Sequence, residues 1–261
     1  PDAHMDLLTQ GLLGAAVAQS GAAKNEARAA TLVGMAAGLL PDADTLITSA
    51  SDPLMFLDYH RHFTHALISV PGVALLAAVF LWPFMRKRLG FLKIWFYALL
   101  GCLFAGILDA STSYGTHLLW PFSDKAIAWS IVSIVDPVVT LALIVGVVIG
   151  LRSLRRRPSA IALTVVVAYL GVGAIQHHRA QDAANELALS RGHTAGRALV
   201  KPTIANVFLW RSLYTLDGRI YADAIQVSPF GNVTTYPGES AQLVGRVLDA
   251  QDPAAPLAPI M

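Results

Sequence analysis

The sequence predicts a mainly α-helical protein, a polytopic transmembrane helical bundle followed by a small C-terminal α+β domain outside the membrane. Hydrophobic residues form 55% of the 261-residue chain and charged residues only 14%. An ordinary soluble domain is about a quarter charged. Long apolar runs lie between residues 29 and 176, and the rest of the chain regains the composition of a soluble protein. We therefore expect a bundle over residues 5–176 and an extramembrane domain over residues 177–261.

Two short helices are expected at the start of the chain. Residues 6–19 have apolar side chains at helical spacing, but this helix is too short to cross a bilayer alone. Residues 29–40 form a helix of small residues, in which Gly34 and Gly38 would let another helix approach closely. Pro41 should end that helix.

Longer apolar segments are expected to cross the membrane: Thr64–Phe84, Ile94–Leu108, Ala126–Leu151 and Ser159–Ile175. Basic residues occupy the connection after the first of these segments, at Arg86–Arg88, and the connection after the third, at Arg155–Arg157. Short loops rich in lysine and arginine stay in the cytoplasm. The opposite ends of these helices are therefore expected on the outer side of the membrane.

The C-terminal part is expected to combine a polar helix with a small sheet. An Ala-rich polar helix should run to about Leu189, and aromatic and β-branched residues recur between residues 207 and 221. Asp217 and Gly218 form a typical two-residue hairpin turn. We expect this α+β domain on the outer face.

The candidate functional residues centre on Tyr59–His65, which contains three histidines and an arginine at the start of an apolar segment. Asp42 and Asp44 follow the second short helix, and Asp109 follows fifteen residues without a charge. Ionisable groups flanked by hydrocarbon are costly, so they generally have partners and a function. The predicted topology brings these groups to one depth, near the outer boundary of the membrane.

Histidine and carboxylate side chains in this arrangement indicate a site for a divalent metal ion. The expected ligands are His60, His65, Asp42, Asp44 and Asp109, a mixed nitrogen and oxygen set. Neighbouring carboxylates repel each other unless a cation or a proton lies between them. Zinc is the favoured ion, with manganese, iron or magnesium as alternatives, and the set could hold one or two ions. The competing interpretation is an interfacial cluster whose histidines bond loop carbonyls or lipid headgroups.

Four residues are candidates for catalysis. Whichever of Asp42 and Asp44 is not a ligand could act as the general base. Arg61 carries a planar fork that matches phosphate or carboxylate, and its alternative role is snorkelling to headgroups. Thr112 is the fourth candidate, although a threonine in a membrane helix commonly bonds its own backbone.

Further polar residues are expected near the same boundary. Gln10 reaches this depth if the first helix runs inward, and His62 is expected to be exposed or to support a ligand. His117 and Asp124 could orient a ligand or a water, although a role as plain boundary residues is the favoured interpretation. Asp136 is a candidate acceptor that would fix the imidazole of a ligand.

The chain contains four ordered motifs, at Asp6–Gly14, Leu40–Asp44, His60–Leu67 and Leu108–Thr116. Together they resemble the YdjM-like family of bacterial membrane-bound metal-dependent hydrolases, over roughly residues 5–151. The resemblance implies a hydrolase of the inner membrane. It also assigns the ligand roles to the expected set of His60, His65, Asp42, Asp44 and Asp109. That family is distantly similar to zinc-dependent phospholipases C and single-strand nucleases, which indicates phosphoester chemistry. His62 stands where the family typically has a small residue.

The sequence therefore predicts a membrane-embedded hydrolase that cleaves a phosphoester in a lipid or lipid-linked substrate. Its active site and C-terminal domain would face the periplasm. The alternatives are an ion or solute permease, or a metal-stabilised scaffold that presents the C-terminal domain. Few polar groups lie in the inner halves of the helices, which disfavours a permease, and the net charge of +2 is too small to indicate a nucleic-acid partner. The sequence favours no particular oligomeric state.

Overall fold

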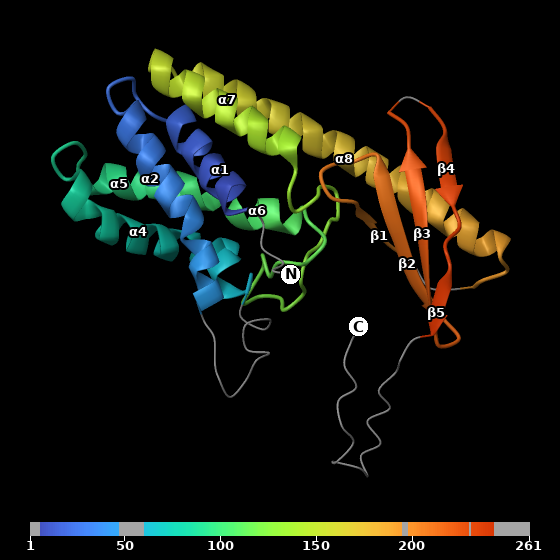
Figure 1. Ribbon diagram of the computed structural model, residues 1–261. Coiled ribbons are helices and arrows are strands. Elements are labelled where there is room, and N and C mark those ends of the chain that lie inside the picture. Colours follow the sequence, from blue (N-terminus) through green and yellow to red (C-terminus); the bar gives the residue numbers. More distant parts are fainter. Residues whose placement is uncertain (1–5, 47–59, 195–197, 230, 243–261) are drawn as a thin grey trace, which may run out of the picture.

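The computed structural model describes residues 6–46, 60–194, 198–229 and 231–242. Its helical elements are α1 (Leu7–Ser20), α2 (Ala27–Leu39), the 3-10 helices η1 (Pro41–Leu46), η2 (Phe63–His65) and η3 (Leu67–Ser69), α4 (Val70–Met85), α5 (Phe91–Leu103), α6 (Ala105–Ala110), α7 (Pro137–Ser153) and α8 (Arg157–Ser190). Its strands are β1 (Leu199–Pro202), β2 (Leu209–Leu216), β3 (Arg219–Val227), β4 (Val233–Tyr236) and β5 (Ser240–Gln242). Helices α1 to α7 form a bundle, and α8 runs along it and continues beyond it to carry the sheet (Figure 1).

Helix α1 is the centre of the bundle, because α2, α5, α7 and α8 all pack around it. Asp6 caps the helix by accepting a hydrogen bond from the Leu8 backbone N–H. A Cβ added at Gly14 would lie 2.3 Å from the Gly34 carbonyl oxygen, and one at Gly101 would lie 2.5 Å from the same atom. Glycine is therefore required where these three backbones meet, which confirms the close approach predicted at Gly34.

Within the described residues, the apolar segments long enough to cross a membrane are Leu67–Met85, Phe91–Ala110 and Arg157–Ser190. Helix α7 is also apolar but shorter. Large hydrophobic side chains on their outer faces remain exposed, among them Phe80 at 74% and Val167 at 68%. Apolar side chains with this degree of exposure suit contact with lipid rather than water.

The prediction that Ala126–Leu151 forms one helix was wrong at its start. Helix α7 begins at Pro137, and the Asp136 side chain caps it by accepting from the backbone N–H groups of Val138 and Val139. The apolar residues before Asp136 form an irregular segment instead. Its backbone is hydrogen-bonded to the end of α6; for example, the Trp129 N–H donates to the Ala110 carbonyl oxygen at 2.7 Å.

Two other helix boundaries differ from the prediction. The helix expected from Thr64 begins only at Val70, after two 3-10 turns, so His65 lies outside the long helix. The polar helix expected after Ile175 is not separate, because α8 continues unbroken for 34 residues. The chain has no glycine or proline between residues 175 and 190 to end it. The expected domain boundary at residues 176 and 177 therefore lies inside a helix.

The C-terminal sheet is antiparallel, with strand order β1-β2-β3-β4 and β5 paired with the other end of β3. The hairpin predicted at Asp217 and Gly218 is confirmed, since both residues have positive φ angles, 49° and 69°, and Leu216 pairs with Arg219. One face of the sheet packs on α8 through Trp210 and Ile225, which are completely buried. The small α+β unit expected from the sequence is thus fastened to the end of α8.

Candidate metal centre

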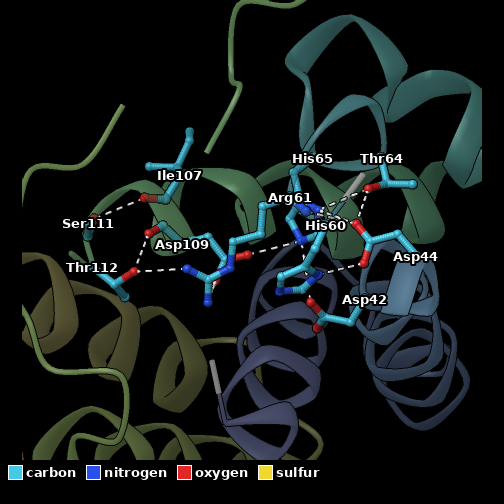
Figure 2. A network of polar contacts seen from close by, with 10 residues as sticks. All are labelled: Asp42, Asp44, His60, Arg61, Thr64, His65, Ile107, Asp109, Ser111 and Thr112. Carbon is cyan, nitrogen blue, oxygen red and sulfur yellow. Dashed lines mark hydrogen bonds and ion pairs between the residues drawn. The ribbon is translucent and has the colours of Figure 1, made fainter. Parts of the chain in front are cut away.

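Three short elements bring the predicted site residues together at one end of the bundle. Figure 2 shows Asp42 and Asp44 on η1 facing the segment of His60 to His65, with Asp109 approaching from α6. These elements are short because Pro41 ends α2 and a second break follows α5. The convergence expected from the sequence is therefore present for the ends of α2 and α6 and for the histidine segment.

Asp42, His65 and Asp109 form the tightest group. Each offers one ligand atom, and these atoms all lie within 4.8 Å of one another. His65 Nε2 is 3.0 Å from Asp109 Oδ2 and 3.4 Å from Asp42 Oδ1. All three side chains are buried, and Asp109 is completely inaccessible. One imidazole nitrogen and two carboxylates in this arrangement could hold a divalent metal ion.

Unsatisfied polar atoms in the group show that the residues fit such an ion. Neither carboxylate oxygen of Asp109 accepts a hydrogen bond from the described residues, and neither does Asp42 Oδ2. His65 Nε2 also has no hydrogen bond within the described chain. Buried polar atoms are nearly always hydrogen-bonded, whereas those of Asp109 and His65 have only ion-pair contacts with each other and with Arg61. Because most of these atoms are acceptors, a cation would be a fitting further partner.

Asp44 differs from the other two aspartates, because donors surround both of its oxygens. Its Oδ1 lies 2.9 Å from His60 Nδ1. Its Oδ2 accepts from the Arg61 backbone N–H at 3.1 Å and from the Thr64 hydroxyl at 2.6 Å, and lies 3.4 Å from His65 Nδ1. Asp44 therefore contacts the opposite ring nitrogen of His65 from the one that faces Asp42 and Asp109.

The surroundings shift the pKa values of two of these groups. Burial opposes ionisation of Asp44, but contacts with His60, His65 and Thr64 outweigh it and lower the pKa of that carboxyl below its ordinary value. Burial would likewise lower the pKa of His65, but its pairing with Asp109, Asp42 and Asp44 raises that pKa well above the ordinary value. Without a metal ion, a proton on His65 offsets the surrounding negative charge.

Arg61 links the group to α6. Its Nη1 donates to the Thr112 hydroxyl at 3.2 Å, and its Nη2 lies 3.4 Å from Asp109 Oδ1. The side chain is 3% exposed, and its guanidinium stands 5.7 Å from the centre of the Tyr114 ring. The backbone adopts a left-handed conformation with φ of 58°, which is uncommon for a residue with a side chain and is found at functional sites.

The hydroxyl of Thr112 has two partners. It donates to the Asp109 backbone carbonyl oxygen at 2.7 Å and accepts from Arg61. The first of these is the backbone hydrogen bond predicted from the sequence as the alternative role of Thr112. Thr112 thereby fixes both the guanidinium and the turn that carries Asp109.

His60 and several outlying residues lie around this group. His60 bonds Asp44 and its ring stands edge-on to that of His65, with 6.4 Å between centroids. His62, expected to be exposed or to support a ligand, is partly buried and packs on the rings of His117 and Trp120. Asp124 is exposed.

The expected role of Asp136 was wrong. Its carboxylate caps α7 and accepts a hydrogen bond from the Tyr169 hydroxyl at 2.8 Å, so it holds two helices together instead of orienting an imidazole. Gln10 is 1% exposed, beside Gly38 in the packed interior, and its amide makes no hydrogen bond with the described residues. The contact of Tyr114 with Arg61 was not predicted, because nothing in the sequence spacing pairs residues 61 and 114.

The apolar helices and this buried centre define an integral membrane protein with a candidate metal site. Comparison with known proteins gives the family: the chain belongs to the YdjM inner membrane protein family, which matches residues 5–180. This confirms the resemblance found in the motifs and the placement in the inner membrane.

A relative in Bacillus subtilis (strain 168), the uncharacterized protein YfhP, is 27% identical over 123 residues. That match covers 47% of this chain and 37% of the relative, so it spans less than half the length of either protein. No solved structure gives a significant match to the chain.

Proposed function

We propose that this protein is a membrane-embedded, metal-dependent hydrolase that cleaves a phosphoester in a lipid or lipid-linked substrate. The observation that supports it best is the buried group of Asp42, His65 and Asp109, whose ligand atoms lie within 4.8 Å of one another. Three protein ligands with room for a water or a substrate are the usual arrangement of a catalytic zinc site. We therefore propose zinc, with manganese, iron or magnesium as alternatives, and assign one ion to this group.

The residues around the ion would then have separate roles in hydrolysis. A bound divalent ion would lower the pKa of a water and polarise the scissile group. Asp42 is proposed to serve twice: its Oδ1, which faces His65 Nε2, would be the ligand atom, and its Oδ2, which accepts no hydrogen bond from the described residues, would take a proton from an attacking water as general base. Asp44, with its lowered pKa and several donors, is a poor base. Its position behind His65 suits it to orient the ligand imidazole.

His60 and Arg61 complete the proposed site. Through its bond to Asp44, His60 would present its Nε2 to the site, and it remains the candidate ligand of a second ion. The guanidinium of Arg61, held by Thr112 and Asp109, would offset negative charge on a phosphoester as it reacts.

A membrane-derived substrate is favoured by an apolar groove between α2 and α4, with a volume of about 570 Å³. Leu76 and Phe80 line it on the side of α4, within the apolar segment Leu67–Met85. Asp44 and Thr64, which belong to the polar network, also line the groove. We propose that an acyl chain enters from the bilayer through this groove, because Asp44 and Thr64 are the polar side chains among its lining residues and the others need not be desolvated from water.

The proposed orientation places the site on the periplasmic side. The exposed basic connections at Arg86–Arg88 and Arg155–Arg157 lie at the end of the bundle remote from η1 and η2 (Figure 1). Basic connections are retained in the cytoplasm, so the opposite end, with the metal centre and the sheet, would face outward.

Elemental analysis combined with a lipid phosphoesterase assay tests the proposal. The full chain, purified in detergent, should contain about one metal ion and release phosphate or a phosphorylated headgroup from a panel of phospholipids. Chelation should abolish turnover, and added zinc should restore it.

Asp109→Asn should remove both metal and turnover. Asp136→Asn is the matched control, because it changes another buried carboxylate but an asparagine still caps a helix. Full turnover after chelation, or full metal content in Asp109→Asn, would contradict the proposed site.

The interior packing disfavours the permease alternative. Towards the other end of α1, Gln19 donates to the Thr31 hydroxyl and accepts from the Ser159 hydroxyl, so these buried polar groups satisfy one another. Between them and the metal centre, the backbones of Gly14, Gly34 and Gly101 touch. A polar path along this side of α1 would have to pass through this contact.

A further inference from the structure

A second cavity, of about 480 Å³, lies between the metal centre and the sheet. One wall is the chain that follows Thr112, at Ser113 and Tyr114, and the other is formed by β1 and β2 with the loop between them. That loop is anchored to the bundle, since the Ala205 backbone N–H donates to Val135 O and to the Ser133 hydroxyl, both at 3.2 Å. The cavity is therefore bounded by elements of both parts of the protein.

The charge of this cavity is positive. Lys201 and Arg211 line it, and none of its lining residues is acidic. The two cations occupy directly opposite positions of the antiparallel β1–β2 pair, on the face of the sheet turned away from α8. Within the described part of the chain, neither one has an ion-pair partner. Like charges placed opposite each other on neighbouring strands repel, so an anion between them would stabilise this arrangement.

The hydroxyl groups of the cavity can complete an anion site. Ser133 accepts the Ala205 N–H, which leaves its own hydrogen to donate to a ligand. Ser113 brings a second hydroxyl from the opposite wall. Two cations with hydroxyl donors are a common set of partners for the oxygens of a phosphate group.

The cavity also adjoins the metal centre. Tyr114 lines it, and the same ring contacts the guanidinium of Arg61, which pairs with Asp109. The apolar groove is lined in part by Asp44 and Thr64, which lie at the other end of the polar network from Thr112 in Figure 2. An acyl chain and an anionic group of one amphipathic molecule would thus be accommodated on opposite sides of the centre.

We propose that the Lys201–Arg211 cavity binds a phosphate group and that it is the subsite for the anionic part of the substrate or for the released phosphate. Its role as a subsite rests on the proposed hydrolase function, whereas phosphate binding itself does not.

Titration calorimetry on the metal-free full chain in detergent tests the binding directly. The probes are inorganic phosphate and a short-chain phosphatidic acid. Without the ion, the carboxylates of the metal centre repel an anion, so binding reports on the cavity. Removing each cation should weaken binding about tenfold, and Lys201→Gln combined with Arg211→Gln about a hundredfold.

The matched control is Lys125→Gln combined with Arg219→Gln. It removes the same amount of positive charge from exposed positions outside the cavity, and it should bind both probes like the wild type. Thermal unfolding without ligand checks that all variants are folded.

The outcomes separate the sources and the two proposals. Tighter binding of phosphatidic acid than of phosphate, lost in the cavity variant, identifies a lipid headgroup, and equal binding identifies free phosphate. Wild-type affinity in the cavity variant, or no binding of either probe to the wild type, overturns the subsite. Because no turnover is measured, a protein that binds phosphate but hydrolyses no lipid would keep the subsite and refute the hydrolase.

Discussion

Two buried clusters in this protein contain the same kinds of groups but differ in how they are satisfied. In the sheet domain, both oxygens of Asp223 accept from Arg191, at 2.7 and 2.9 Å, and one of them also accepts the Gly238 N–H. The Tyr214 hydroxyl is bonded by Arg191 and lies 2.8 Å from His193. In the bundle, Asp109 is more deeply buried, and its oxygens have ion-pair contacts with Arg61 and His65 but accept no hydrogen bond from the described residues.

The difference separates a structural cluster from a candidate ligand set. A closed network of donors and acceptors stabilises a fold and leaves nothing to bind. An open network of acceptors destabilises the fold by itself, and a bound cation can offset that cost. The contrast therefore predicts that the two clusters respond in opposite ways to mutation.

Replacing the histidine of each cluster should give the largest contrast. His65→Ala removes the only nitrogen ligand of the proposed centre, so metal affinity should fall by roughly two orders of magnitude or more. His193→Ala should leave the metal content unchanged, because His193 packs on Tyr214 and Tyr221 of the sheet, outside the metal centre. Elemental analysis after dialysis measures both. Equal metal loss in the two variants would remove the distinction between the clusters.

Replacing the arginine of the closed cluster should affect stability alone. Arg191→Met leaves the buried carboxylate of Asp223 without its main partner, which costs about 3 kcal/mol of unfolding free energy. Thermal and denaturant unfolding measure this loss, and the metal content should stay at the wild-type level. A variant with wild-type stability would show that the Arg191–Asp223 pair is not structural.

Asp44 should show an intermediate effect. Asp44→Asn keeps the shape of the side chain but weakens the acceptor behind His65 Nδ1, and loss of such a partner typically lowers metal affinity about 10- to 100-fold. Competition with a chelator of known affinity gives the dissociation constant. A loss as large as that of His65→Ala would instead identify Asp44 as a direct ligand.

The metal-free protein should also depend on pH in a particular direction. The pKa of His65 is raised in the folded state, so its contribution to stability is complete below the ordinary value of about 6.5 and disappears as pH rises through the folded value. The melting temperature of metal-free wild type should thus fall more between about pH 6 and about pH 9 than that of His65→Gln. Metal-loaded protein should lack this fall, because the ion replaces the proton. If the melting temperatures of metal-free wild type and metal-free His65→Gln fell equally with pH, this role of the His65 proton would be contradicted.

The smallest effect is expected at Asp136. Asp136→Ala removes the cap of α7 and the bond to Tyr169, which should cost about 1 to 2 kcal/mol without changing metal content. Unfolding and elemental analysis together test this. Loss of metal in this variant would restore Asp136 to the centre.

The sequence predicted those features that depend on local or periodic signals. The glycine contact at Gly34, the hairpin at Asp217 and the convergence of Asp42, His65 and Asp109 all follow from spacing and from the positions of apolar segments. The segment before Pro137 misled the prediction, because its apolar residues pack as irregular chain against α6, and periodicity alone does not distinguish this from a helix.

The details of the centre depend on contacts that spacing does not encode. The division between Asp42 and Asp44 follows from the left-handed turn at Arg61, which brings its N–H to Asp44. The pairs Tyr114–Arg61 and Lys201–Arg211 each join segments that only the folded chain brings together.

Helix α8 has a mechanical consequence for the whole molecule. Its 34 residues make a rod of roughly 50 Å, longer than the hydrocarbon layer of a bilayer, and the rod is continuous from the basic connection to the sheet. Each residue of an α-helix turns the chain by about 100°. The number of residues in α8 between the bundle and the sheet therefore sets the direction in which the sheet points around the helix axis. One inserted residue there would rotate Lys201 and Arg211 away from Tyr114.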